Sequence, residues 1–204
     1  MGPIRVGFFY GAIAVVIAVF SQFFFLFLDP VETTDWVLAA LTDFLPLAAL
    51  AAYIMLAFLA ALRARPTYLE SGVPYRSFLL RDAALAAALV GALAGLANVL
   101  STAVQAIFLA DEIRAFAADA APRIAAYVNE VRQDLSDPPP PTSAEQIQRL
   151  LQPPEIRDLA QSVGNAAIGT MILGALGAFV GLLRGLAKRN SDDDGASSER
   201  TARN

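Results

Sequence analysis

The stretch from Ala83 to Ala110, AALAAALVGALAGLANVLSTAVQAIFLA, contains no charged residue and is predominantly apolar all round a helix. Crossing a hydrocarbon core of about 30 Å takes about 20 apolar residues in a helix that rises about 1.5 Å per residue. A helix of a soluble domain is expected instead to be apolar on one face only. The stretch therefore predicts a membrane-spanning helix.

Three further stretches have the same character. Val6 to Leu28, Phe44 to Leu62 and Gly164 to Leu183 are all uncharged, and the second reaches back to Trp36 when Asp43 is included. The chain is thus predicted to be an all-α, four-span transmembrane helical bundle. Its predicted parts are residues 1–110 with spans at about 6–28, 36–62 and 83–110, an extracytoplasmic helical segment at 111–161 with a proline-rich linker at 138–141, a fourth span within 162–189, and a disordered cytoplasmic tail at 190–204.

Positive charges in the connections fall on alternate sides of the predicted membrane. Lys and Arg are retained on the cytoplasmic side, whereas acids contribute little to orientation. The connection after the first span holds Asp29, Glu32 and Asp35 but no basic residue, whereas the second connection and the end of the fourth span are basic. We therefore expect a multi-pass protein of the cell (plasma or inner) membrane with both termini in the cytoplasm. The residues expected at the inner membrane surface are Arg63, Arg65, Arg76, Arg81, Lys188 and Arg189.

Composition argues against several classes of function. The chain has no His and no Cys, and its net charge is −4. It therefore lacks the usual ligands of zinc, haem and copper, the commonest general base, and any thiol. It also has no basic patch of the kind that nucleic acid requires. We expect no cofactor, no metal site, no catalytic residue and no nucleic-acid partner, so the chain is predicted not to be an enzyme. A membrane-embedded hydrolase using Asp43 and Asp111 is the weakest alternative, because no nucleophile or oxyanion motif accompanies these acids.

Residues 111–161 form the only sizeable part expected outside the bilayer. Their apolar residues recur at three- and four-residue steps, which indicates one stripe along an amphipathic helix. Pro122 interrupts the stripe, and a proline inside a helix removes one backbone hydrogen bond and clashes with the preceding turn. We therefore expect the third span to run past Ala110 and to kink or restart near Ala121. The stripe consists of Ile113, Phe116, Ala117, Ala120, Ile124, Tyr127, Val128, Val131 and Leu135.

A second, shorter helix should follow the proline-rich linker. Asp137 and the prolines at 138–141 should end the first helix, because a proline run lacks amide donors and favours an extended conformation. Thr142 and Glu145 have the spacing of a capping box, and the Pro-Pro pair at 153–154 should stop the short helix and begin the next. Together these parts predict a helical hairpin. Its apolar stripe either covers itself, lies on the membrane interface or contacts a partner.

Small residues at four-residue spacing mark three of the predicted spans. Such ridges let helix backbones approach closely, so that dispersion and weak hydrogen bonds replace the hydrophobic drive that lipid removes. Packing of the third and fourth spans within one chain is one interpretation, and homodimerisation is the other. The glycines expected at helix contacts are Gly7, Gly11, Gly91, Gly95, Gly177, Gly181 and Gly185.

Polar side chains gather in the outer half of the predicted spans. Such groups are costly in hydrocarbon unless they are paired, so we expect them to face inward and bond to one another. They form either interhelical hydrogen bonds, worth about 0.6 to 2 kcal/mol each, or a small polar vestibule in which Asp43 is the only ionisable member. The candidate cluster is Gln22, Asp43, Asn98, Ser101, Thr102, Gln105, Asn165 and Thr170.

A Gly-Val-Pro-Tyr-Arg-Ser-Phe turn at 72–78 precedes the glycine-studded third span, and a proline-marked segment precedes the glycine-rich fourth span. In this order of parts, residues 1–189 resemble an uncharacterised family of small bacterial four-span membrane proteins. That family is known only as a domain of unknown function. The resemblance therefore implies the fold and the location but no site residues.

We expect a non-enzymatic integral membrane protein, a structural or accessory component whose outer hairpin contacts a partner. The alternative is a small-solute or ion translocator that uses the polar cluster around Asp43, Asn98 and Gln105. The expected partners are the lipid bilayer and, in addition, another membrane or extracytoplasmic protein or a second copy of the chain.

Overall fold

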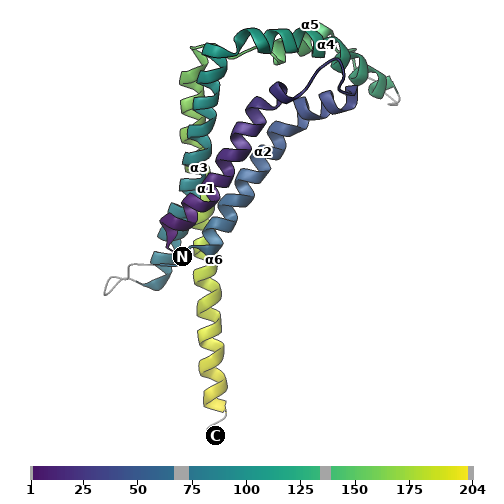
Figure 1. Cartoon of the computed structure of the whole chain (residues 1–204). Coiled ribbons are helices and arrows are strands. Elements are labelled where there is room, and N and C mark those ends of the chain that lie inside the picture. Colours follow the sequence, from purple (N-terminus) through teal and green to yellow (C-terminus); the bar gives the residue numbers. More distant parts are fainter. Residues whose placement is uncertain (1, 67–73, 134–138, 202–204) are drawn as a thin grey trace. The chain divides into compact units, whose positions relative to one another are not determined.

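A computed structural model of the chain describes residues 2–66, 74–133 and 139–201 (Figure 1). Within those ranges every regular element is a helix and no residue forms a strand. The prediction of an all-α chain is therefore confirmed. In chain order the elements are α1 (Pro3–Phe23), the 3-10 helix η1 (Phe24–Phe27), α2 (Asp35–Arg63), α3 (Tyr75–Phe108), α4 (Ala110–Gln133), α5 (Ala144–Leu150) and α6 (Asp158–Thr201).

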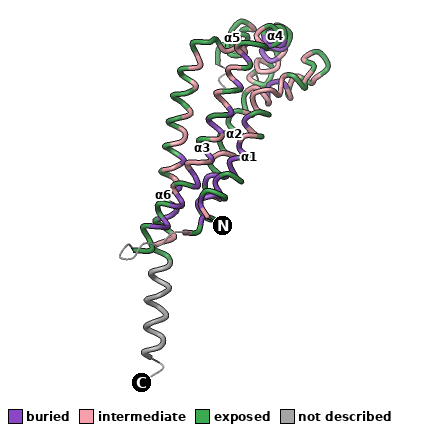
Figure 2. The backbone as a smooth tube through the Cα atoms, turned by 60° about the vertical axis from the view of Figure 1, so that its left-hand side comes forward, coloured by how far each residue is buried: buried purple, intermediate pink, exposed green. Residues whose placement is uncertain are grey.

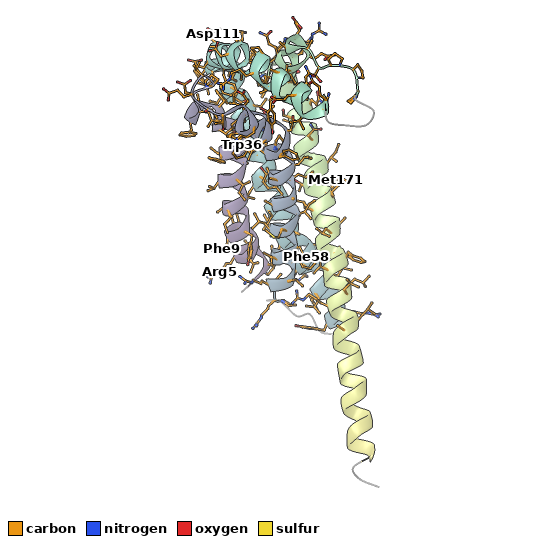
Figure 3. All side chains as sticks on the ribbon, turned by 90° about the vertical axis from the view of Figure 1, so that its right-hand side faces the viewer. Arg5, Phe9, Trp36, Phe58, Asp111 and Met171 are labelled. Atoms are coloured by element: carbon orange, nitrogen blue, oxygen red, sulfur yellow. The ribbon has the colours of Figure 1, made fainter. Side chains whose placement is uncertain are left out.

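Four helical segments are long and apolar enough to cross a membrane, as the sequence predicts. They are Pro3–Phe27, Asp35–Arg63, Tyr75–Phe108 and Asp158–Ala187. Many of their large apolar side chains face outward, including Phe9, Phe58 and Met171, which are labelled in Figure 3. Lipid tails are as apolar as leucine, so outward-facing side chains of this kind suit a helix in a bilayer. The chain is thus a multi-pass membrane protein by the length and composition of its helices.

The chain divides into two compact units, to which each long membrane helix contributes a part. Unit 1 comprises residues 1–16, 52–96 and 164–204. Unit 2 comprises residues 17–51 and 97–163. Each unit is described by itself below.

Small side chains dominate the core of unit 1. Figure 2 colours its buried positions, most of which are alanine or glycine. A β-carbon at Gly177 of α6 would lie 2.5 Å from the carbonyl oxygen of Ala83 in α3, and one at Gly181 would lie 2.6 Å from that of Leu79. The backbones of α3 and α6 are therefore in direct contact, as small-residue ridges allow.

The other glycines predicted at helix contacts also lie against a second helix of unit 1. On α1, Gly7 and Gly11 face α3. On α3, Gly91 and Gly95 face α6, and Gly185 of α6 meets the side chain of Arg76 in α3. All of these contacts join helices of the same chain.

The core of unit 2 combines alanines with a cluster of large apolar side chains around Phe116 and Ile124. The apolar stripe of α4 is covered by the first turns of α2, by η1 and by α5. Phe25 of η1 lies 6.0 Å from the ring of Phe116, measured between centroids. The stripe is therefore buried against several parts of the same chain. The cluster comprises Leu38, Ala39, Phe116, Ala120, Ala121, Ile124, Ala125 and Ile147, with Phe25, Leu28, Tyr127, Val128, Ala144 and Leu151 packed against it.

The break between α3 and α4 lies at Leu109, ahead of the position that the sequence predicts. Backbone hydrogen bonds continue across it, from Leu109 N–H to the Gln105 carbonyl and from Ile113 N–H to the Leu109 carbonyl. Of the two alternatives expected near Ala121, the restart is wrong, because Pro122 lies inside α4, and the kink stays a prediction. Pro122 is exposed, while Ala121 before it and Ile124 after it are buried in the core. Burial on both sides of the proline offsets the one hydrogen bond that it removes.

The capping box of α5 begins one residue later than the predicted Thr142 and Glu145 pair. The Ser143 hydroxyl accepts the N–H of Gln146, and the Gln146 side chain accepts the N–H of Ser143. Thr142 is held by α4 instead. Its N–H donates to Asn129 Oδ1 at 2.8 Å, and its carbonyl accepts from Asn129 Nδ2 at 2.9 Å. Residues 134–138, which include Leu135 of the stripe and the first residue of the predicted linker at 138–141, lie outside the described residues.

The last helix continues beyond the predicted membrane boundary. α6 reaches Thr201, whereas the sequence predicted a disordered tail from Asn190. Extending an existing helix costs less than nucleating a new one, which accounts for helix in a stretch with few apolar residues.

Candidate functional site

The predicted polar cluster yields one contact between helices. Gln105 of α3 is buried, and its Nε2 donates to the backbone carbonyl of Gln22 at 2.5 Å and to Gln22 Oε1 at 3.4 Å. This bond supplies a donor to a carbonyl in the last turn of α1, where helix carbonyls lack their regular partners. Gln105 therefore joins α3 to the carboxyl end of α1 within unit 2.

The other members of the predicted polar cluster form no hydrogen bond to another helix within the described residues. Thr102 donates to the carbonyl of Asn98, and Thr170 donates to the carbonyl of Ala166, each within its own helix. A hydroxyl that bonds to its own helix needs no partner on another helix. Ser101 is buried, Asn98 is half-buried, and Asp43 and Asn165 are exposed. Asn165 and Thr170 belong to unit 1, whereas the rest belong to unit 2.

Asp43 instead lines a hollow of about 360 Å³ between α2 and α4. The wall from α2 adds Trp36, Ala39, Ala40 and Phe44. The wall from α4 consists of Tyr127, Val128, Val131 and Arg132. This feature, called the α2–α4 hollow here, combines aromatic rings with one acid and one base. Such a set suits binding rather than catalysis.

A second hollow, of about 660 Å³, lies where α3, α4, α5 and the turn into α6 meet. Arg114 forms an ion pair with Asp111, and Arg157 forms one with Glu155 at 2.9 Å. These pairs are exposed, so each contributes little to stability. The hollow is lined by Ala106, Ala110, Arg114, Ala117, Gln148, Gln152, Pro153, Pro154, Glu155, Ile156 and Arg157.

Arg123 of α4 organises the connection between η1 and α2. Its guanidinium donates to the carbonyls of Val31 and Thr33, each at 2.8 Å, and to that of Pro30. Asp35 Oδ1 lies 2.5 Å from Arg123 Nη2, within ion-pair distance although not aligned as a hydrogen bond. The fixed fork of the arginine suits several acceptors at once. The sequence alone shows a positive charge at Arg123 but not the carbonyls that it binds.

Arg184 has the corresponding role in unit 1. Its Nη1 donates to the carbonyls of Ala61 at 2.7 Å and Ala64 at 2.9 Å, at the carboxyl end of α2. These carbonyls have no partner within their own helix, and a cation there also complements the helix dipole. Nearby, the Arg63 guanidinium lies 5.6 Å from the centre of the Tyr10 ring.

Asp82 of α3 is a buried carboxylate that was not among the residues predicted from the sequence. It is 3% exposed, and its Oδ1 accepts from Arg81 Nε at 2.9 Å. Its Oδ2 has no hydrogen-bond partner within the part of the chain that the structure describes. Its neighbour Arg81 is exposed, as are Arg63, Arg65 and Arg76 of the predicted inner-surface set. The side chains of Lys188 and Arg189 lie outside that part.

Glu145 lies in the first turn of α5, outside the candidate spans, and its surroundings lower the pKa of its carboxyl group. A hydrogen bond from its own backbone N–H lowers its pKa, and the Ser143 hydroxyl lowers it further. Such bonds favour the charged form at the amino end of a helix. Among the described residues, no three His, Cys, Asp or Glu side chains lie together as metal ligands.

Comparison of the chain with protein-family models, with curated proteins and with solved structures finds no match in any of the three. The resemblance to a family of small four-span membrane proteins therefore stays a prediction.

Proposed function

We propose that this chain is a non-enzymatic integral membrane protein, a structural or accessory component whose residues 111–161 contact a partner protein outside the cytoplasm. The support comes from the apolar surface that unit 2 leaves uncovered. Phe116 and Ile124 of the α4 stripe are buried, so this part of the stripe is not available to a partner. Leu150 and Ile156, however, are 76% and 69% exposed on either side of the Pro-Pro pair at 153–154.

The surface around these two residues has the composition of a protein contact. Ile156 lines the larger hollow, together with Arg114 and Arg157. Exposed apolar side chains rimmed by charged groups commonly mark interaction sites, and arginine is enriched there. The single observation that carries the proposal is the exposure of Leu150 and Ile156 in the segment outside the four apolar spans.

Affinity purification of the full chain in mild detergent tests the contact. We expect one or more proteins recovered with the native chain to be lost from a Leu150→Glu, Ile156→Glu double variant. Val31→Glu is the matched control, because Val31 is equally exposed in unit 2 but lies in the η1–α2 connection. Recovery of the same partners by the double variant, or of none by the native chain, would contradict the proposal.

The orientation belongs to the same proposal. Both termini lie in the cytoplasm of a cell or inner membrane, and α4 and α5 form a hairpin on the opposite side. The arginines of the second connection support it, since basic residues are retained inside. The family resemblance in the order of parts supports the same layout.

The absence of cysteine makes the orientation simple to test. Gln133→Cys and Ser77→Cys each place one thiol at an exposed position on opposite sides of the proposed membrane. A maleimide that does not cross the membrane should label Gln133→Cys in intact cells, and Ser77→Cys only after permeabilisation. The reverse pattern would overturn the orientation.

A further inference from the structure

We propose that the α2–α4 hollow binds the headgroup of a phosphatidylethanolamine molecule, with the ammonium at Asp43 and the phosphate at Arg132. The two residues line the same hollow of about 360 Å³, but none of the ion pairs among the described residues joins them. Opposite charges that share a hollow without pairing complement a ligand that carries both charges.

The acid is available for such a ligand. Asp43 is exposed and takes part in no hydrogen bond or ion pair within the described ranges. The rings of Trp36 and Tyr127 line the hollow beside it. A carboxylate with aromatic faces is the usual arrangement for holding an ammonium group, because the ring face attracts a cation.

The base is held in place by the fold. Arg132 Nη1 donates to Thr142 Oγ1 at 2.7 Å, and Thr142 is in turn held by Asn129. This leaves the other guanidinium N–H groups free to donate into the hollow. Arginine binds phosphate through two parallel N–H groups, so the remaining donors are of the right kind.

The position of the hollow favours a lipid over a soluble zwitterion. Asp43 lies in the candidate membrane span Asp35–Arg63, and the next exposed large apolar side chains on the chain are Phe44 and Leu47. These apolar side chains suit the acyl chains that follow a headgroup into the bilayer. Trp36 and Tyr127 are also the residue types that gather at the interface between membrane and water.

The chain contains a single tryptophan, and it lines the hollow, so its fluorescence reports on the site directly. The full chain is reconstituted into vesicles of phosphatidylglycerol, which has no ammonium group, and the vesicles contain dibrominated phosphatidylethanolamine or dibrominated phosphatidylglycerol, because bromine quenches nearby tryptophan. We expect phosphatidylethanolamine to reach the same quenching at about three- to tenfold lower mole fraction than phosphatidylglycerol. One ion pair and one cation–π contact account for a preference of this size.

Two variants assign the preference to the hollow. Asp43→Asn should reduce the preference for phosphatidylethanolamine to less than about twofold, whereas Asp119→Asn, an exposed acid of α4 outside the hollow, should leave it unchanged. Arg132→Gln should weaken quenching by both lipids, because both carry a phosphate.

Equal quenching by the two lipids in the native chain would overturn the proposal. So would a preference that survives Asp43→Asn, and so would a preference for phosphatidylglycerol, which would indicate an anion site at Arg132 alone. The measurement is independent of the partner contact at Leu150 and Ile156, so the two proposals fail separately.

Discussion

Unit 1 and unit 2 both bury many alanines, but they differ in the closest contacts between their helices. In unit 1 the helices meet through glycine and alanine, and the backbones of α3 and α6 touch at Gly177 and Gly181. In unit 2 the helices meet through Phe116, Ile124 and their neighbours, and arginine and asparagine side chains bond to the backbone of the connections.

The difference follows from the solvent that each unit is expected to meet. Helices in lipid gain little by burying a large apolar side chain, so close backbone approach and dispersion hold them together. A segment in contact with water gains about 25 cal/mol for each Å² of apolar surface that it buries, so large side chains form its core. Unit 2 contains the residues predicted outside the bilayer, and the cluster of large side chains around Phe116 and Ile124 lies among them.

The largest expected effect is truncation in the core of unit 2. Phe116→Ala removes a buried ring and should lower the free energy of unfolding by about 3 kcal/mol, the usual cost of an aromatic-to-alanine change. Phe108→Ala is the control, because Phe108 is 71% exposed on α3, so lipid can replace the missing ring. Thermal unfolding in detergent, followed by circular dichroism, measures the stability of both variants. Similar losses of stability in Phe116→Ala and Phe108→Ala would contradict the prediction.

A smaller effect is expected from adding one methyl group in unit 1. Gly177→Ala forces α3 and α6 apart and should destabilise the protein by about 1 to 3 kcal/mol. Gly169→Ala has no atom within 4 Å of the new β-carbon, so it should be neutral or stabilising by up to about 1 kcal/mol. Gly177→Ala should raise the hydrogen-exchange rates of backbone amides in unit 1. Equal tolerance of both changes would show that backbone contact is unimportant there.

The two arginines that bond to carbonyls allow a finer comparison. Arg123→Gln leaves the carbonyls of Val31 and Thr33 without a donor and removes the ion pair with Asp35. The change should destabilise unit 2 by about 1 to 2 kcal/mol. Arg184→Gln frees the carbonyls of Ala61 and Ala64 and should cost about 1 kcal/mol in unit 1. Hydrogen exchange of the η1–α2 connection and of the end of α2 measures the two effects. A larger effect at Arg184 would reverse the expected order.

The smallest effect concerns the pH dependence of α5. The pKa of Glu145 is lowered in the folded state, so its ionised form stabilises α5 fully above the ordinary value of 4.5. That contribution is lost as the pH falls through the lowered pKa. Faster hydrogen exchange of α5 amides relative to α4 amides below pH 4.5 is the expected result. Glu145→Gln should remove this dependence, and an unchanged dependence would assign it to another group.

The helices could be predicted from the sequence more fully than the contacts between them. The uncharged runs predicted four apolar helices because the requirement for about 20 apolar residues is local in the chain. The break at Leu109 was missed, because whether Pro122 ends a helix depends on what buries Ala120 and Ala121. The capping box was displaced by one residue, because Thr142 is bound by Asn129 of another helix and only Ser143 is left to cap α5.

The candidate sites depended still more on the fold. Sequence spacing places Asn98, Ser101, Thr102 and Gln105 on one face of α3, but it does not say which helix that face meets. Only Gln105 reaches another helix, and Asp43 lies in a hollow with Tyr127 and Arg132, far along the chain.

By itself the sequence determined the all-helical class and the four apolar spans, because hydropathy and helix length are properties of single segments. Tertiary structure alone decided which glycines touch which backbone, which carbonyls Arg123 and Arg184 satisfy, and which side chains share the α2–α4 hollow. The physical reason is that these contacts join residues distant in sequence, so their energies depend on how the helices pack and not on any one segment.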